Sequence, residues 1–251
     1  ATRSGPVTYV VTYTGAETVT LTAEQVTLHR TGTANGTVGV SGTGMTRTVT
    51  VSGVTGDGEL SISIAAESAS DAAGNRSAAA GPSASFLADN TPPTVTISPP
   101  SSSVTGAGPV TYTVTYGGAA GISLTAANVT LNKTGTADGL VVVSGTGMSR
   151  TVTVSGITGD GTLGISLAAG TAVDAAGNTA LAAGPSATFT VDNSILSVAI
   201  GPPSASLTAS GPVTYGVHFT DAESVVLNLS HVTLNKTGTA NGTVSVSGSG
   251  L

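Results

Sequence analysis

The sequence repeats itself with a period of 103 residues, and this period limits the fold more than any single residue does. The pentapeptide GPVTY at residues 5–9 returns at residues 108–112 and again at residues 211–215. The turn sequence DAAGN at residues 71–75 likewise returns at residues 174–178. A repeat of about 100 residues is too long for a solenoid unit and has the length of an autonomous domain. We therefore expect a series of similar domains.

The register of the repeat gives one complete copy and two incomplete ones. Ala1 aligns with Val104, and Leu251 aligns with Met148. We predict a first repeat over 1–90 that lacks its first strand, a complete second repeat over 91–193, and the N-terminal half of a third repeat over 194–251. Both incomplete repeats hold the same middle segment and neither supplies only what the other lacks, so we expect that the two ends cannot complete each other in a polymer by simple strand donation. We interpret the sequence as a stretch of a longer array.

Composition and charge exclude several classes of protein. The sequence has no Cys, 8% charged residues and a net charge of −6. These values exclude a disulfide framework and a thiolate metal site, and we expect no nucleic acid partner because only seven residues are basic. No apolar run reaches the roughly 18 residues of a membrane span, so we expect none in this segment. His29, His218 and His231 occupy different positions of the repeat, and we therefore expect no enzymatic activity.

Alternation of apolar and polar residues predicts half-buried strands. Val110, Tyr112 and Val114 alternate with threonines, which directs the apolar side chains to one face of a strand. This pattern and the turn residues predict seven strands in the second repeat, near 94–98, 109–116, 129–133, 139–143, 149–155, 162–167 and 186–191. Seven short strands in about 100 residues indicate a two-sheet Greek-key sandwich.

Short polar segments between these strands carry the signals of turns. Asp138-Gly139, with its counterparts in the other two repeats, predicts a tight hairpin that needs a positive φ angle. Residues 158–161 (TGDG) and 174–178 (DAAGN) predict two further turns. A threonine three residues before an amide side chain, as at Thr125, predicts a capped single helical turn.

These motifs resemble those of a known family. The stretches GPVTYTVTY, LTAANVTLNKTGT, SGTGMSRTVTVSGITGDGTL, AVDAAGN and VDN are similar to bacterial immunoglobulin-like (Big-type) repeat domains of large surface adhesins and extracellular fibre proteins. The similarity covers essentially the whole sequence. It implies an all-β fold of tandem seven-stranded immunoglobulin-like Greek-key β-sandwiches in a linear array. It also implies an extracellular location on a bacterial cell surface.

Acidic residues gather where neighbouring repeats are expected to meet. The loop order of a seven-strand sandwich places Asp57, Asp89 and Asn90 at the end of the first repeat that faces the second. Asp174 and Asn178 of the second repeat would face them across the junction. Oxygen ligands from two domains suit Ca²⁺, and three unpaired carboxylates would repel one another without a cation. We therefore predict an interdomain Ca²⁺ site formed by these five residues.

The same pattern supplies an equivalent half-site between the second and third repeats, from Asp160, Asp192 and Asn193. The family resemblance also allows interdomain calcium, because similar bacterial stalks use it. The alternative is that aspartates in GDG and DAAGN turns bond only local backbone amides, which Asp does well. In that case the chain has no cofactor.

The sequence as a whole favours a structural role. We expect a stalk or spacer segment of a long extracellular surface protein, whose partners are neighbouring repeats of the same chain. The first alternative is a self-assembling extracellular filament or biofilm-matrix component. Charged side chains on edge strands prevent lateral pairing of chains, and this sequence has few of them. The second is a glycan- or protein-binding module. Such a module would use residues found in one repeat only, such as Glu17, Glu24, Glu59 and Glu67.

Overall fold

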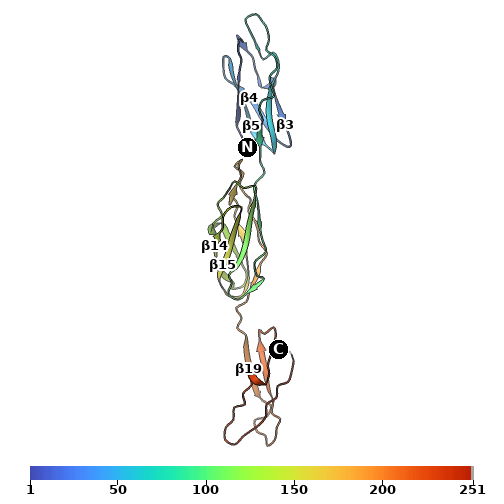
Figure 1. The fold of residues 1–251 in the computed structure, drawn as a ribbon, viewed down its shortest axis with the longest axis vertical. Coiled ribbons are helices and arrows are strands. Elements are labelled where there is room, and N and C mark those ends of the chain that lie inside the picture. Colours follow the sequence, from blue (N-terminus) through green and yellow to red (C-terminus); the bar gives the residue numbers. More distant parts are fainter. Residues whose placement is uncertain (250–251) are drawn as a thin grey trace. The chain divides into compact units, whose positions relative to one another are not determined.

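The computed structural model describes residues 1–249 and is all-β, with three single-turn 3₁₀ helices among its strands (Figure 1). The chain forms two compact units, Ala1–Val191 and Asp192–Leu251. The first unit contains the first repeat and residues 91–191 of the second. Over the described residues, no helix is both long and apolar enough to cross a membrane.

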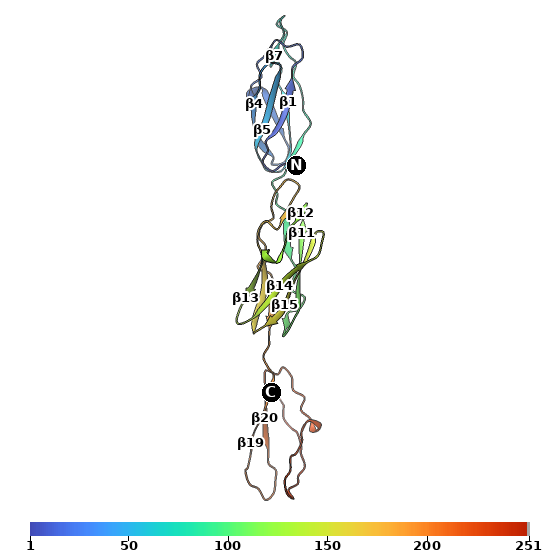
Figure 2. The ribbon, with the colours of Figure 1, turned by 90° about the vertical axis from the view of Figure 1, so that its left-hand side faces the viewer.

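The first repeat folds into two three-stranded sheets and one short strand pair. Its elements are β1 (Val7–Thr12), β2 (Thr18–Val19), η1 (Ala23–Gln25), β3 (Val26–Arg30), β4 (Asn35–Ser41), β5 (Thr46–Thr55), β6 (Gly58–Ile64), β7 (Ala69–Ser70) and β8 (Phe86–Ala88). The strand orders are β1-β5-β4, β3-β6-β8 and β2-β7. Figure 2 shows β1 at one edge of its sheet, next to β5.

The second repeat has the same plan with one more strand in each larger sheet. Its elements are β9 (Thr94–Ile97), β10 (Val104–Thr105), β11 (Val110–Gly117), β12 (Gly121–Ile122), η2 (Ala126–Asn128), β13 (Val129–Lys133), β14 (Asp138–Ser144), β15 (Ser149–Thr158), β16 (Gly161–Leu167), β17 (Ala172–Val173) and β18 (Phe189–Val191). The strand orders are β14-β15-β11-β9, β10-β18-β16-β13 and β12-β17.

The two larger sheets of each repeat share one apolar core. In the second repeat, β11 contributes Val110, Tyr112 and Val114, and β16 of the other sheet contributes Leu163 and Ile165, all at most 1% exposed. Two sheets with a shared core are consistent with a β-sandwich. The core of the first repeat lies within residues 9–88 and that of the second within residues 95–191, so each repeat has a core of its own.

Each of the seven strands predicted for the second repeat coincides with an observed strand. The largest deviations are three residues: β15, predicted over 149–155, continues to Thr158, and the last strand, predicted over 186–191, begins only at Phe189 as β18. Ser186 lies beside β16 without joining the ladder there, because its side-chain oxygen accepts from the Ile165 amide at 2.9 Å. The two-residue strands β10, β12 and β17 were not predicted, since two residues show no alternation.

The prediction of a tight hairpin at Asp138-Gly139 is wrong. The strands on its two sides, β13 and β14, belong to different sheets, so this segment crosses from one sheet to the other. The positive φ angle occurs earlier, at Gly135 (60°), and Gly139 lies in β14 beside a bulge. A Cβ atom on Gly139 would come 2.9 Å from a methyl group of Val154. The glycine is therefore required by close packing between strands.

The other predicted turns are present. Thr125 caps η2, because its amide donates to Asn128 Oδ1 at 3.0 Å while the side chains and backbone form a reciprocal capping box. Gly159 and Gly161 adopt positive φ angles of 73° and 143° in the turn between β15 and β16. This turn also joins the two sheets.

The second unit contains one antiparallel strand pair and a 3₁₀ turn: β19 (Ser197–Pro203), β20 (Tyr215–Thr220) and η3 (Leu229–His231). β19 and β20 pair in the register of β9 and β11. Over the described residues, the counterparts of β13 and β14 form no strand. In the second repeat these two strands pair with β16 and β15, whose counterparts are not in the sequence. Apolar residues such as Val198 and Ile200 consequently stay 59% and 71% exposed.

Candidate functional site at the repeat junction

The turn between β5 and β6 is tied to the end of the first repeat. The Asp57 carboxylate accepts hydrogen bonds from the Asn90 amide at 2.6 Å and from Thr91 Oγ1 at 2.9 Å. Asn90 Nδ2 in turn donates to the Gly56 carbonyl at 2.8 Å. The bond from the Asn90 amide, followed by that from Thr91, lowers the pKa of Asp57 below its ordinary value. The predicted proximity of Asp57 and Asn90 is therefore present.

The facing turn of the second repeat is closed by Asp174. Its Oδ1 atom accepts from the amides of Ala176 and Asn178 at 2.9 and 2.8 Å, and its Oδ2 atom accepts from Asn178 Nδ2 at 2.8 Å. Desolvation raises the pKa of Asp174, but the hydrogen bonds from Asn178 and then Ala176 outweigh it and lower the pKa overall. Asp174 thus orients Asn178 through two of these three bonds, all inside one turn.

Asn178 carries the contact across the junction. Its Nδ2 atom also donates to the backbone carbonyl of Asp89, at 2.8 Å, and Arg3 donates from its guanidinium to the Gly177 carbonyl at 3.1 Å. Asn178 is 5% exposed, whereas its counterpart Asn75 in the first repeat is exposed. The junction therefore joins the repeats through an amide side chain and a backbone carbonyl. The carboxylate of Asp89 instead accepts from the Thr91 amide at 3.2 Å.

The predicted calcium ligands lie at this junction, but their carboxylates are engaged locally. Asp57 bonds Asn90 and Thr91, where the first repeat ends and the second begins, and Asp174 bonds its own turn. Within residues 1–249 no group of three or more His, Cys, Asp or Glu side chains is arranged to hold a metal ion. Calcium requires six to eight oxygen ligands, so a cation here would have to replace several of these hydrogen bonds. In the observed geometry, Asp57 and Asp174 accept hydrogen bonds from amides and a hydroxyl of neighbouring segments.

The second predicted half-site is divided between the two compact units. Asp160 lies in the first unit, where its amide donates to Thr136 Oγ1 at 2.9 Å. Asp192 and Asn193 lie in the second unit. Asp192 accepts from the Ser194 amide at 2.9 Å, and Ser194 lowers the pKa of Asp192 through its side chain and its backbone.

The repeat-specific acidic residues lie on separate elements and are exposed. Glu67 pairs with Arg76 at 2.9 Å, and Glu59 accepts from Ser85 at 3.0 Å. Glu17 precedes β2, and Glu24 lies in η1. Exposed pairs of this kind contribute little to stability.

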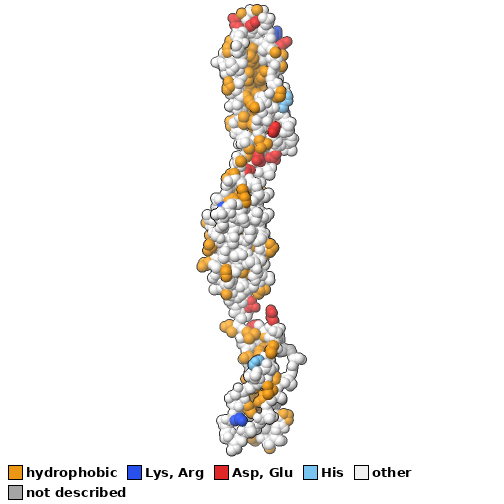
Figure 3. Space-filling view, in the orientation of Figure 1, with side chains coloured by type: hydrophobic (Ala, Val, Ile, Leu, Met, Phe, Trp, Pro, Cys, Tyr) orange, Lys and Arg blue, Asp and Glu red, His pale blue; other side chains and the backbone are white. Residues whose placement is uncertain are grey.

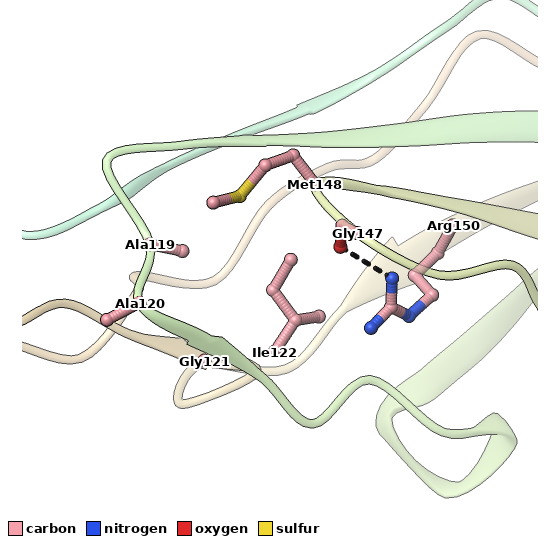
Figure 4. Close-up of a pocket in the computed structure, with 7 residues that line it drawn as sticks. All are labelled: Ala119, Ala120, Gly121, Ile122, Gly147, Met148 and Arg150. Atoms are coloured by element: carbon pink, nitrogen blue, oxygen red, sulfur yellow. Dashed lines mark hydrogen bonds between the residues drawn. The ribbon is translucent and has the colours of Figure 1, made fainter.

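A shallow hollow of about 140 Å³ lies between the start of β12 and the turn before β15 (Figure 4). Ala119, Ile122 and Met148 supply apolar walls. Arg150 is its charged residue, and its guanidinium donates to the Gly147 carbonyl at 2.8 Å, which closes the β14–β15 turn. The arginine therefore serves the fold, and the hollow holds no pair of titratable groups.

Comparison of the chain with protein-family models, with curated protein sequences and with solved structures finds no match. The function must therefore be argued from the geometry. Sequence reasoning missed Arg3 and Thr91 at the junction. Arg3 breaks the repeat, since Gly106 and Ala209 stand at the equivalent positions, and no periodic signal marks it.

Proposed function

We propose that this chain is a stalk segment of a long extracellular protein on a bacterial surface, built of immunoglobulin-like Greek-key sandwiches in tandem. The observation that carries the proposal is the contact between Asn178 and the Asp89 carbonyl. It joins two repeats that each have a core of their own. In such an arrangement every added repeat extends the molecule, and stability is roughly a sum over repeats plus modest junction terms.

The surface of the second repeat supports a spacer role. Figure 3 shows few charged side chains on the visible face of this repeat, and acidic side chains gathered where the first repeat meets the second. A spacer needs a polar surface and a defined junction, and the few charges of this face and the bonds between the first and second repeats support that role. The projected binding domain would lie outside these residues.

Interdomain calcium is the second part of the proposal. Asp57, Asp89 and Asp174 lie at one junction, and the hydrogen bonds of their carboxylates come from amides and hydroxyls rather than from cations. A divalent cation would replace some of these donors and bind both repeats at once. The stalk does not depend on this ion, because the bond from Asn178 joins the repeats without it.

Single-molecule pulling of the full chain tests the stalk. The complete repeat of 103 residues should unfold as a separate event that releases about 350 Å of contour, at about 3.4 Å per residue. Extension without such events would reject the proposal. Small-angle scattering with Ca²⁺ and then with excess chelator tests the ion. Unchanged dimensions and unchanged melting would reject calcium and leave the stalk in place.

A lateral filament is the second candidate, and one observation favours it. Leu140 and Val142 are 69% and 54% exposed on β14, which lies at the edge of its sheet. Their counterparts are Thr37 and Gly39 in the first repeat, so this apolar edge is specific to the second. Electron microscopy separates the candidates, since a stalk gives single threads and a lateral filament gives bundles.

A further inference from the structure

The Asn-Gly and Asp-Gly pairs close no hairpin in the first or second repeat, yet they share one local geometry in all three repeats. In the first repeat the Gly36 amide donates to Asn35 Oδ1 at 2.8 Å. In the second repeat the Gly139 amide donates to Asp138 Oδ1 at 2.7 Å. In the third, the Gly242 amide donates at 3.0 Å to Oδ1 of the asparagine before it. In each pair the main-chain nitrogen of glycine therefore lies against the side-chain carbonyl group of the preceding residue.

The glycine amide of these pairs takes no part in the strand ladder. In the first repeat, Asn35 pairs with Thr55 and Thr37 pairs with Ser52, and the irregularity between them leaves Gly36 out of the register. Its amide donates to the Asn35 side chain instead. Glycine also has no side chain that could shield its nitrogen. The nitrogen can therefore lose its proton without breaking a hydrogen bond of the sheet.

This contact places a nucleophile beside an electrophile. Once deprotonated, the Gly36 nitrogen can attack Cγ of Asn35, and the new N–Cγ bond closes a succinimide ring while the side-chain nitrogen leaves as ammonia. Water then adds to either carbonyl group of the ring and opens it, which gives aspartate or isoaspartate. The net change is the replacement of an amide by a carboxyl group, with a water taken up and an ammonia released. No oxidant or cofactor takes part.

The second repeat carries the product residue at the same position. Asp138 stands where the first and third repeats have Asn35 and Asn241, and its carboxylate accepts from Lys133 Nζ at 2.9 Å. The bond from Lys133, more than that from the Gly139 amide, lowers the pKa of Asp138 below its ordinary value. A carboxylate at this position is therefore compatible with the fold and has a basic partner.

A basic residue stands five positions before each asparagine as well. Arg30 precedes Asn35, and Lys236 precedes Asn241 and donates from Nζ to its Oδ1 atom at 2.9 Å. A cation on this oxygen withdraws electrons from Cγ and stabilises the negative charge that develops on the oxygen during the attack. After the reaction the same cation would pair with the new carboxylate, as happens in the second repeat.

We propose that Asn35 and Asn241 are sites of spontaneous deamidation in the folded chain, and that the aspartates formed there pair with Arg30 and Lys236. Each reaction adds one negative charge to a surface that has few charges. Lys236 already binds the reacting side chain, whereas among the described residues Arg30 makes no such bond to Asn35. Asn241 should therefore react faster than Asn35.

Peptide mapping by mass spectrometry, after incubation of the full chain at mildly alkaline pH, tests the proposal. The peptides that contain Asn35 and Asn241 should gain the mass difference between an amide and a carboxyl group, and faster as pH rises, because the attacking nitrogen must lose a proton. Asn75 is the internal control, since it is exposed on the first repeat but is followed by Arg76, whose side chain hinders the attack.

Synthetic peptides of residues 31–41 and 237–247, incubated in parallel, show that the conditions allow the reaction. A full chain that stays unmodified while the peptides react overturns the proposal, as does a chain in which Asn75 reacts as fast as Asn35.

Substitutions at the two sites assign the chemistry. Asn35→Gln and Asn241→Gln keep an amide but would have to close a larger ring, so each should lose the reaction at its own position only. Lys236→Gln should slow the reaction at Asn241 and leave that at Asn35 unchanged. Equal rates at Asn241 with and without Lys236 would overturn the assistance assigned to the lysine.

Tyr9→Ala distinguishes reaction in the folded chain from reaction after unfolding. This variant destabilises the first repeat without touching the site, so reaction through unfolded molecules would accelerate at Asn35. Reaction in the native geometry should keep its rate, and acceleration overturns the proposal.

Asn35→Asp supplies the product in pure form and tests the ion pair. In that background Arg30→Gln should raise the pKa of the introduced carboxyl group, measured by NMR titration, because the group loses its cation. A carboxyl pKa that does not change would overturn the pairing with Arg30.

Discussion

The first and second repeats have nearly the same sequence but different degrees of burial. Tyr9 and Tyr112 occupy equivalent positions and lie 6.5 and 6.4 Å, centroid to centroid, from Phe86 and Phe189. Tyr112 and Phe189 are at most 1% exposed, while Tyr9 and Phe86 are half-buried. The difference follows the presence of β9 beside β11, whereas among residues 1–249 β1 has a neighbouring strand, β5, on one side only. The alternation of a strand decides which side chains face inward, and the neighbouring strand decides how completely they are covered.

A second difference lies in the polar groups inside the two repeats. Tyr13 donates to Ser68 Oγ at 2.8 Å, and Ser68 lies 3.3 Å from Ser77 Oγ. The equivalents in the second repeat are Tyr116, Thr171 and Ala180. The hydroxyls of Tyr116 and Thr171 are buried there and have no hydrogen-bond partner among the described residues. The second repeat is therefore the more completely buried one, but it also holds two buried hydroxyls without a hydrogen-bond partner. Variants can separate the effect of burial on stability from the effect of these hydroxyls.

The largest expected effect comes from removing the equivalent tyrosines. Tyr112→Ala should lower the free energy of unfolding of the second repeat by about 4 kcal/mol, because a fully buried aromatic ring leaves a cavity. Tyr9→Ala should cost the first repeat only about 2 kcal/mol, since its ring is half exposed to water. Hydrogen exchange with peptide-level resolution reports the two repeats separately. Equal losses would contradict the role assigned to the neighbouring strand.

A control sharpens this prediction. Residues 91–103, added in register before Ala1, would supply the first repeat with an equivalent of β9 beside β1. In that background the loss caused by Tyr9→Ala should rise toward that of Tyr112→Ala.

The next effect should be the same in both repeats, because it depends on the backbone they share. A Cβ atom on Gly159 or on its equivalent Gly56 would overlap the carbonyl oxygen of Thr136 or Thr33. Each glycine-to-alanine variant should lose about 3 kcal/mol from this overlap and from the positive φ angle. Gly147→Ala is the control, with a φ angle of 67° and no atom within 4 Å, and should lose about 1 kcal/mol. Urea denaturation measures all three, and unequal losses at Gly56 and Gly159 would show that the two turns differ.

The sequence predicted local features well and long-range ones less well. The strand β11 followed from alternation, and the cap at Thr125 from a three-residue spacing, since both signals lie within the element itself. The hairpin at Asp138-Gly139 failed because the partner of β14 is set by β15 rather than by the turn before it. At the junction, loop order placed Asp57 near Asn90. Asp89 takes part in the junction through its backbone carbonyl, which accepts from Asn178. The sequence did not predict this contact, because it depends on turn geometry that composition does not reveal.

A smaller effect should follow from repairing the interior of the second repeat. Thr171→Ser combined with Ala180→Ser introduces the two serines of the first repeat, and should stabilise the second repeat by about 1 kcal/mol by giving the Tyr116 hydroxyl a partner. Ser68 is 0% exposed in the equivalent place, so a serine fits there. Ser77→Ala in the first repeat is the reciprocal variant and should destabilise it. Thermal unfolding of the full chain gives both values, and a loss of stability in the double variant would contradict the comparison.

The smallest expected difference concerns acid sensitivity of the two DAAGN turns. Asp71 and Asp174 both have a pKa lowered below 3.8, chiefly by side-chain and backbone bonds from the asparagine four residues later, which for Asp174 outweigh desolvation. A lowered pKa in the folded state means that the stabilisation is present above about pH 5 and is lost as pH falls through that lowered pKa.

Asp174 also orients Asn178 toward the Asp89 carbonyl, so its protonation weakens the junction as well as the turn. Asp174→Asn should therefore remove more of the acid dependence of melting between about pH 5 and pH 2 than Asp71→Asn does. Melting curves of the full chain across this range measure the difference. The two variants should have equal slopes if the junction contributes nothing, and that result would leave the comparison resting on the β1 edge and the interior hydroxyls alone.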